Sequence, residues 1–127
     1  MKKIIKTDNA PAPIGPYNQA VLSGNMLFIS GQIAINPKSG ELETGNLAEE
    51  TKLVMENLKA ILTEAGLTFN DVIKTSIFIS DMNNFSKINE IYGTYFDAET
   101  APARETVEVA NLPKFVNVEI SAIAVKS

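Results

Sequence analysis

The sequence predicts an α+β domain in which a sheet of about six, mostly antiparallel strands carries two helices on one face. Three observations predict this class. Two segments repeat apolar residues at helical spacing, and about six shorter segments alternate polar and apolar residues or concentrate β-branched ones, as strands do. The third is length, because 127 residues of which 45% are hydrophobic suit one domain over residues 1–127.

The first part of the chain predicts three strands. Residues 2–7 are expected to form a short edge strand, and residues 8–17 hold three prolines and a glycine, which indicates a stiff loop. Residues 18–23 and 26–33 then predict a hairpin, because the Gly-Asn dipeptide between them favours a tight turn.

The first helix follows a polar turn at 36–45. Asn46 precedes Glu49 by three residues, a variant of the capping box that starts helices. The helix is expected over 47–65 and to end at Gly66. Its apolar residues fall at helical spacing: Leu47, Val54, Met55, Leu58, Ile61, Leu62 and Ala65.

A strand and a second helix come next. Residues 71–81 predict a strand that is apolar on both faces. Asn83 or Asn84 is expected to cap the helix that follows. Its inner stripe comprises Phe85, Ile88, Ile91, Tyr92, Tyr95 and Phe96.

The last two strands carry the polar groups that point to a function. From Arg104 the chain alternates, with Arg104 and Thr106 on one face and Val107 on the other. After a turn at 111–115, the final strand directs small apolar residues to the helices and presents Glu119 and Ser121 on its other face. We expect these four polar side chains to share the face away from the helices. A domain of this size cannot cover that face, which predicts a partner subunit and a pocket in the interface.

Composition excludes several classes of function. Eleven basic and fifteen acidic residues give a net charge of −4, which disfavours a general nucleic-acid binder. The absence of cysteine and histidine excludes disulfides, thiolate nucleophiles, Ser-His and Cys-His catalytic pairs and the usual zinc sites. No Asp-rich spacing supports a Mg²⁺ or Ca²⁺ site. The start does not resemble a signal peptide and no apolar run reaches membrane-spanning length, so we expect a cytoplasmic protein.

Arg104 and Glu119 are the leading candidates for chemistry, and each has an ordinary alternative. A lone strand arginine is more often a surface residue paired with a glutamate, and Glu119 can equally be a solvated strand residue. The functional alternative for Arg104 is a guanidinium fork for a substrate carboxylate. Gly31, directly after Ser30, interrupts an apolar run and indicates a bulge or a close approach.

The ending "PARETVEVANLPKFVNVEISAIAV" resembles the signature region of the RidA/YjgF family, the reactive-intermediate deaminases. The resemblance extends through "IGPYNQAV", "LFISGQIAINPKSGE", "NLKAILTEAGL" and "VIKTSIFISDMNNFSKIN". It implies a chorismate-mutase-like fold, a homotrimer with a site at each subunit interface, and no cofactor. The implied reaction is hydrolysis of 2-iminopropanoate and 2-iminobutanoate, or their enamine tautomers, which pyridoxal-phosphate dehydratases release from serine and threonine.

The resemblance also implies roles for particular residues. Arg104 corresponds to the arginine that holds the substrate carboxylate, and Glu119 to the glutamate that positions the attacking water. Thr106 stands where relatives often carry cysteine, at a position expected to act through its backbone carbonyl, which threonine keeps. Four further residues match the lining of the pocket: Tyr17, Ser30, Gly31 and Asn89.

Two other functions stay open at this point. One is an endoribonuclease or translation inhibitor, as described for some relatives, although the net charge and the lack of histidine disfavour RNA cleavage. The other is a non-catalytic sensor of small carboxylates. Within the implied trimer, we expect Arg104 and Glu119 to come from one subunit and Tyr17, on its proline loop, from the neighbour.

Overall fold

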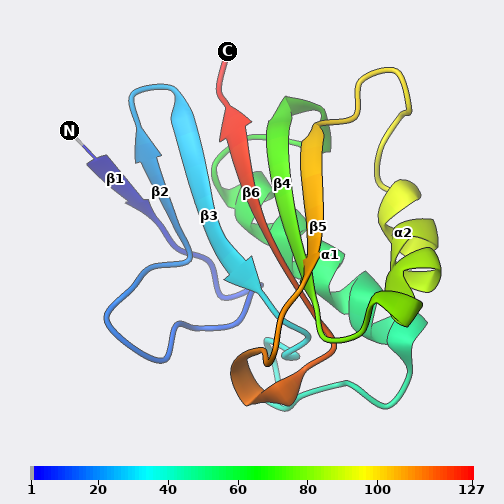
Figure 1. Ribbon diagram of the computed structural model, residues 1–127. Helices are drawn as coiled ribbons and strands as arrows, with labels where there is room; N and C mark the ends of the chain where they lie inside the picture. The colour runs from blue at the N-terminus through cyan, green and yellow to red at the C-terminus, as the bar shows by residue number, and fades with distance from the viewer. Residues whose placement is uncertain (1) are drawn as a thin grey trace.

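The protein is built on one six-stranded sheet, and its structure, a computed structural model, describes residues 2–127. The strands in chain order are β1 (Lys2–Ile5), β2 (Ala20–Ser23), β3 (Met26–Gln32), β4 (Val72–Ile79), β5 (Ala103–Glu108) and β6 (Val118–Val125). In space they follow the order β1-β2-β3-β6-β4-β5, and neighbours are antiparallel except β4 and β5, which are parallel. Helix α1 (Leu47–Glu64) lies behind the sheet, with α2 (Phe85–Gly93) next to it near the β5 edge (Figure 1). The predicted α+β class is confirmed.

The first hairpin turns where its dipeptide predicted. Gly24 has a φ of 61°, a left-handed value that glycine adopts without strain. Strand β2 begins at Ala20 rather than at residue 18, because the preceding Gln19 serves the proline loop instead. Its side-chain amide donates to three loop carbonyls, those of Thr7, Ala10 and Pro11. The loop at 8–17 is therefore held in place without regular structure of its own.

Helix α1 starts and stops at the predicted signals. The Asn46 side chain accepts a hydrogen bond from the backbone N–H of Glu49 at 3.0 Å. Gly66, with a φ of 79°, follows the last turn. For α2 the prediction was only partly right. Asn84 occupies the N-cap position without a side-chain capping bond, while Asp81 accepts from the N–H of Asn83 and caps a short 3-10 turn before the helix.

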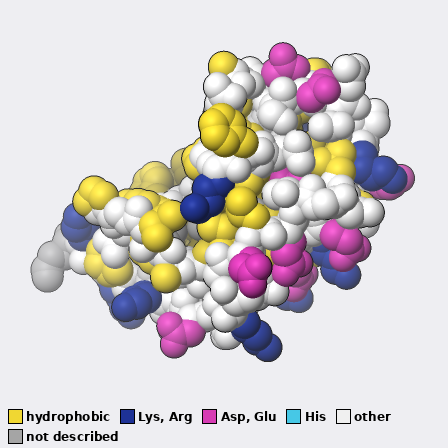
Figure 2. All heavy atoms as spheres, turned by 90° about the horizontal axis from the view of Figure 1, so that it is seen from below, with side chains coloured by type: hydrophobic (Ala, Val, Ile, Leu, Met, Phe, Trp, Pro, Cys, Tyr) yellow, Lys and Arg dark blue, Asp and Glu magenta, His cyan; other side chains and the backbone are white. Residues whose placement is uncertain are grey.

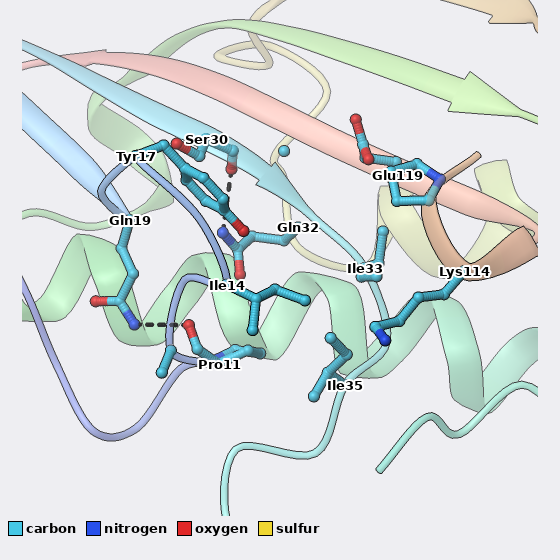
Figure 3. Close-up of a pocket in the computed structure, with 13 residues that line it drawn as sticks. Pro11, Ile14, Tyr17, Gln19, Ser30, Gln32, Ile33, Ile35, Lys114 and Glu119 are labelled. Atoms are coloured by element: carbon cyan, nitrogen blue, oxygen red, sulfur yellow. Dashed lines mark hydrogen bonds between the residues drawn. The ribbon is translucent and has the colours of Figure 1, made fainter. Parts of the chain in front are cut away.

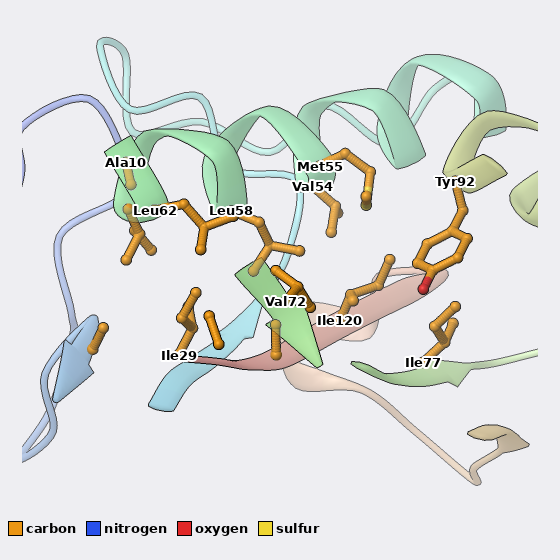
Figure 4. Packing of buried hydrophobic residues seen from close by; sticks show 14 of the residues in the cluster. Ala10, Ile29, Val54, Met55, Leu58, Leu62, Val72, Ile77, Tyr92 and Ile120 are labelled. Carbon is orange, nitrogen blue, oxygen red and sulfur yellow. The ribbon is translucent and has the colours of Figure 1, made fainter. Parts of the chain in front are cut away.

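The hydrophobic core lies between α1 and the helix-facing side of the sheet (Figure 4). Leu58 and Leu62 of α1 are almost fully buried, as are Ile77 and Ile120 from the strands opposite. Complete burial of such a side chain contributes about 1.5–3 kcal/mol. No helix within residues 2–127 has the length and apolar character needed to cross a membrane.

The register of β5 overturns one prediction. Because β5 runs parallel to β4, Arg104 lies beside Thr75 and Thr106 beside Ile77. Thr75 and Ile77 are buried on the helix side of the sheet, and side chains in register point to the same face. Arg104 and Thr106 therefore lie on the helix face. The expectation that they share the open face with Glu119 is wrong.

The physical reason lies in the connection between the two strands. The sequence predicted correctly which residues alternate along β5. Which face of the sheet each set of side chains occupies depends on the register of β5 against β4, and the α2 crossover between the two strands imposes that register. The strand is at the sheet edge, where the short α2 leaves Arg104 exposed on the helix side. On the open face Val107 remains 39% exposed and Phe28 of β3 45% exposed.

Candidate functional site

A cavity of about 430 Å³ opens at the end of the sheet where β3 finishes and β6 begins. Its walls come from the proline loop and from the turn Pro113–Phe115, and its lining includes Ile14, Ile33 and Ile35 (Figure 3). Seen from below, the surface carries a band of hydrophobic side chains with a basic side chain among them (Figure 2). Largely apolar hollows with a few polar groups are typical ligand sites. Four predicted site residues line this cavity: Tyr17, Ser30, Gly31 and Glu119.

Glu119 projects from the open face of β6 and packs directly on Gly31 of β3. A Cβ atom built on Gly31 would lie 2.6 Å from Oε2 of Glu119, which is closer than nonbonded atoms approach. The pairing of β3 with β6 shifts between Ile29 and Gln32, so the bulge that the glycine indicated is present. Only glycine at this position leaves room for the carboxylate where it lies.

The surroundings of Glu119 disfavour the charged form of its carboxyl. The side chain is half-buried, and desolvation raises the pKa of its carboxyl above the ordinary value. A carboxyl shifted in this direction can exchange protons closer to neutral pH than an ordinary glutamate. Within residues 2–127 no group of three or more His, Cys, Asp or Glu residues could hold a metal ion.

The loop wall of the cavity is hydrogen-bonded to its floor. The Ser30 hydroxyl donates to the carbonyl of Asn18 at 2.6 Å, and its backbone N–H donates to the carbonyl of Gln19 at 2.9 Å. Tyr17 lies on this wall, half-exposed and close to Ser30 in Figure 3. Tyr17 and Glu119 therefore line the same cavity of one chain. The expectation that separated Tyr17 from Glu119 does not hold for this cavity, because one chain supplies both residues.

Arg104 belongs to a different polar cluster, which α2 supports. Its Nη1 donates to Oδ1 of Asn89 at 2.6 Å. The guanidinium carbon lies 5.7 Å from the ring centre of Phe85 and 5.2 Å from that of Tyr92. Tyr92 is in turn fixed by a hydrogen bond of 2.7 Å between its hydroxyl and that of Thr75. The Asn89 amide and the two aromatic rings thus restrain Arg104, although this residue is exposed.

The predicted site residues consequently divide into two groups on opposite faces of the sheet. Glu119 is in register with Phe78, and Phe78 with Val107, so Glu119 lies on the open face. Arg104 lies on the helix face with Asn89 and Thr106. The hydroxyl of Thr106 is buried and has no hydrogen-bond partner within residues 2–127. A single chain does not bring Arg104 and Glu119 together.

Lys114 lines the cavity, and sequence reasoning missed it. The segment 111–115 was identified only as a turn. Pro113 marks the turn, but the direction of the next side chain depends on a backbone conformation that no local pattern reveals. Lys114 is the basic residue in the lining, as Glu119 is the acidic one.

A family model described as Endoribonuclease L-PSP matches residues 7–126. The chain belongs to this family, the RidA/YjgF family. The match covers both clusters, the cavity of Glu119 and the arginine of β5.

Relatives of this RidA/YjgF chain resemble it over almost its whole length. A RutC family protein of Pyrococcus horikoshii is 56% identical over 126 residues, 99% of each chain. The 2-iminobutanoate/2-iminopropanoate deaminase of Mus musculus is 48% identical over 126 residues, 99% of this chain and 93% of its own. The crystal structure of Escherichia coli TdcF with bound serine has a TM-score of 0.92 and 49% identity, covering 98% of this chain and 99% of that one. Such names support a deaminase role in the family.

Proposed function

We propose that this protein is a cofactor-independent deaminase that hydrolyses reactive 2-imino acids to 2-keto acids and ammonia. Its substrates would be 2-iminobutanoate and 2-iminopropanoate, released by pyridoxal-phosphate enzymes in the cytoplasm. The observation that carries the proposal is the half-buried Glu119 carboxylate, packed on Gly31 in a largely apolar cavity. The deaminase name of a relative that is 48% identical supports the same reaction class.

The proposed reaction consumes one water molecule. Its oxygen attacks the imine carbon while the Glu119 carboxylate takes a proton and passes it to the imine nitrogen. The hydroxyl proton of the resulting carbinolamine then moves to the nitrogen, the C–N bond breaks as the C=O bond forms, and ammonia leaves. Both hydrogens of the water end on nitrogen. The raised pKa of Glu119 suits a group that must both accept and donate a proton.

Arg104 of a neighbouring copy completes the site in this proposal. Its guanidinium donates one N–H to Asn89, and its other N–H groups stay available for a bidentate contact with the substrate carboxylate. In a homotrimer, neighbouring chains would cover the open sheet face, where Phe28 and Val107 are exposed. The carboxylate would then be anchored by one copy while Glu119 of the other directs the water.

Two alternatives make different predictions. The family model is described as an endoribonuclease, which favours RNA cleavage. The net charge of −4 and the absence of histidine disfavour this alternative. A carboxylate sensor would use the same cavity and would bind small acids without turnover. Imine hydrolysis by the wild-type protein separates the proposed deaminase from both.

The test is to generate 2-iminobutanoate with a threonine dehydratase and to follow 2-oxobutanoate formation, with the uncatalysed rate subtracted. We expect the wild-type protein to accelerate hydrolysis and Glu119→Gln to lose at least about 100-fold, the usual contribution of a general acid-base group. Glu64→Gln, which removes an exposed carboxylate at the end of α1, is the matched control and should retain full activity. The deaminase proposal fails if the wild-type protein gives no acceleration, or if Glu119→Gln is as active as the control.

A further inference from the structure

The turn Pro113–Phe115 holds two consecutive residues in a strained backbone conformation. Lys114 has φ 55° and ψ 19°, and Phe115 has φ 56°. Both values fall in the left-handed region, which costs a residue with a side chain roughly 1–2 kcal/mol. Strain of this kind persists only where the surrounding structure enforces it, and it concentrates at functional sites.

Buried contacts on both sides enforce this conformation. Leu112 and Val116, which flank the strained pair, are both buried. The fully buried Glu50 of α1 then accepts two hydrogen bonds from Asn117, one from its backbone N–H at 2.8 Å and one from Nδ2 at 2.7 Å. The turn is thus fixed to the core and to α1, and it holds the Lys114 side chain against the cavity.

Lys114, an exposed residue, brings a positive charge without an ion-pair partner among residues 2–127 to the lining of the cavity. The ion pairs within residues 2–127 join Lys74 to Glu105 and Lys87 to Glu90, so Lys114 has no carboxylate partner there. Figure 3 shows its side chain extending past Ile33 toward Ile35, while the Glu119 carboxylate points elsewhere. The cavity therefore offers a carboxylate at one place and a separate ammonium, among isoleucines, at another.

The proposed hydrolysis mechanism does not use Lys114. The 2-carboxylate of the substrate goes to Arg104 of the neighbouring copy, and the imine carbon to Glu119. What remains is the substrate side chain, which would extend into the cavity toward Lys114. A lysine carries its charge on a flexible four-carbon stem and forms strong charge-assisted hydrogen bonds with carboxylates.

We propose that the protein accepts 2-imino dicarboxylates of four or five carbons and that Lys114 binds their distal carboxylate. This inference rests on the proposed deaminase function and adds a substrate class to it. Lys114 then determines specificity, because a monocarboxylic imine leaves the ammonium solvated, whereas a dicarboxylic imine neutralises it. The reaction at the imine carbon is unchanged: water adds, the C–N bond breaks and ammonia leaves.

The experiment compares two imines made in place by flavin oxidases, 2-iminosuccinate from aspartate and 2-iminobutanoate from 2-aminobutanoate. Semicarbazide traps the unhydrolysed imine, so the decrease in semicarbazone reports deaminase activity. We expect Lys114→Gln to lower kcat/KM at least tenfold for 2-iminosuccinate and less than twofold for 2-iminobutanoate. Lys114→Arg should keep most of the activity on both. Lys52→Gln, an exposed lysine of α1, is the control and should change neither.

The remaining outcomes distinguish this inference from the deaminase proposal. Wild-type activity on 2-iminobutanoate but none on 2-iminosuccinate, or an equal loss on both imines in Lys114→Gln, overturns the role of Lys114 and leaves the deaminase intact. If the wild-type protein hydrolyses neither imine, the deaminase proposal fails, and calorimetry with stable acids decides the binding claim. Succinate should then bind at least tenfold more tightly than butanoate, and Lys114→Gln should remove the difference. Equal binding, or no binding, refutes the inference.

Discussion

The cavity around Glu119 and the cluster around Arg104 are built in opposite ways. Glu119 is half-buried on a central strand, and its position depends on a bulge, a glycine and a hydrogen-bonded loop of the same chain. Arg104 is exposed on an edge strand, and one short helix restrains it. Contacts within one chain thus position Glu119, whereas Arg104 faces outward.

This difference matters for the proposed function, in which the binding site is divided between copies of the chain. A carboxylate that must exchange protons benefits from desolvation, which the chain can provide by itself. Arg104, to which the proposal assigns a ligand held by another copy, is exposed, and contacts with Phe85 and Tyr92 instead of burial limit its rotamers. Each part can be disrupted separately.

Gly31→Ala should have the largest effect. The added Cβ would meet Oε2 of Glu119 at 2.6 Å, so the carboxylate must move away from its position. A displacement of about 1 Å at a reacting group can cost about 100-fold in rate, and we expect at least that loss of imine hydrolysis. Circular dichroism should show an unchanged fold, because a flexible side chain can yield. Gly45→Ala, where nothing lies within 4 Å of the new Cβ, is the control. Similar activity in the two variants would contradict the role of this contact.

Arg104→Ala should come next. Removal of a charge-assisted bidentate contact is expected to cost about 2–3 kcal/mol of transition-state stabilisation, roughly 30- to 150-fold in rate. Arg104→Lys should rescue poorly, because an ammonium cannot form the fork. The thermal unfolding midpoint should barely change, since the side chain is exposed. Near-normal activity in either variant would refute the anchor role.

Mixed assemblies sharpen the same prediction. Arg104→Ala and Glu119→Gln, unfolded and refolded together, should regain activity above either parent, because some interfaces would pair an intact Arg104 with an intact Glu119. Native mass spectrometry would count the subunits and verify mixing. Mixed trimers without recovery would place both residues in the site of one chain, and a monomer would refute the shared site.

The pH dependence of stability should change in Glu119→Gln. Because burial raises the pKa of Glu119 in the folded state, its stability contribution is full below the ordinary carboxyl pKa and is lost as pH rises through the raised value. Relative to the wild type, Glu119→Gln should therefore gain stability between about pH 4 and neutral pH. Urea unfolding across that range measures the difference. A difference that does not vary with pH would indicate an unshifted Glu119.

Thr106→Val should have the smallest effect. The hydroxyl of Thr106 has no hydrogen-bond partner within residues 2–127, and its replacement by a methyl group preserves shape and strand propensity. We expect activity within tenfold of the wild type and unchanged or slightly greater stability, with Thr106→Cys behaving similarly. A larger loss in the valine variant, equivalent to more than about 1.4 kcal/mol, would show that the hydroxyl takes part.

Local patterns predicted much of the fold and part of the candidate site. The Asn46 cap, the apolar stripe of α1, the turn at Gly24 and the bulge at Gly31 were all found where the sequence indicated them. Each depends on neighbouring residues, through a side-chain cap, a periodic face or a dihedral angle that glycine permits. That is why a single sequence could reveal them.

The amino-acid sequence by itself determined which residues alternate along β5, but the tertiary structure decided which face Arg104 occupies. That face is set by the pairing of Arg104 with Thr75, which are distant in the chain and meet only because α2 crosses between their strands. Likewise, the Glu50–Asn117 contact joins residues 67 positions apart and helps to hold the strained turn that directs Lys114 to the cavity. Local composition encodes periodicity, whereas register and strain are settled by contacts that exist only after the chain has packed.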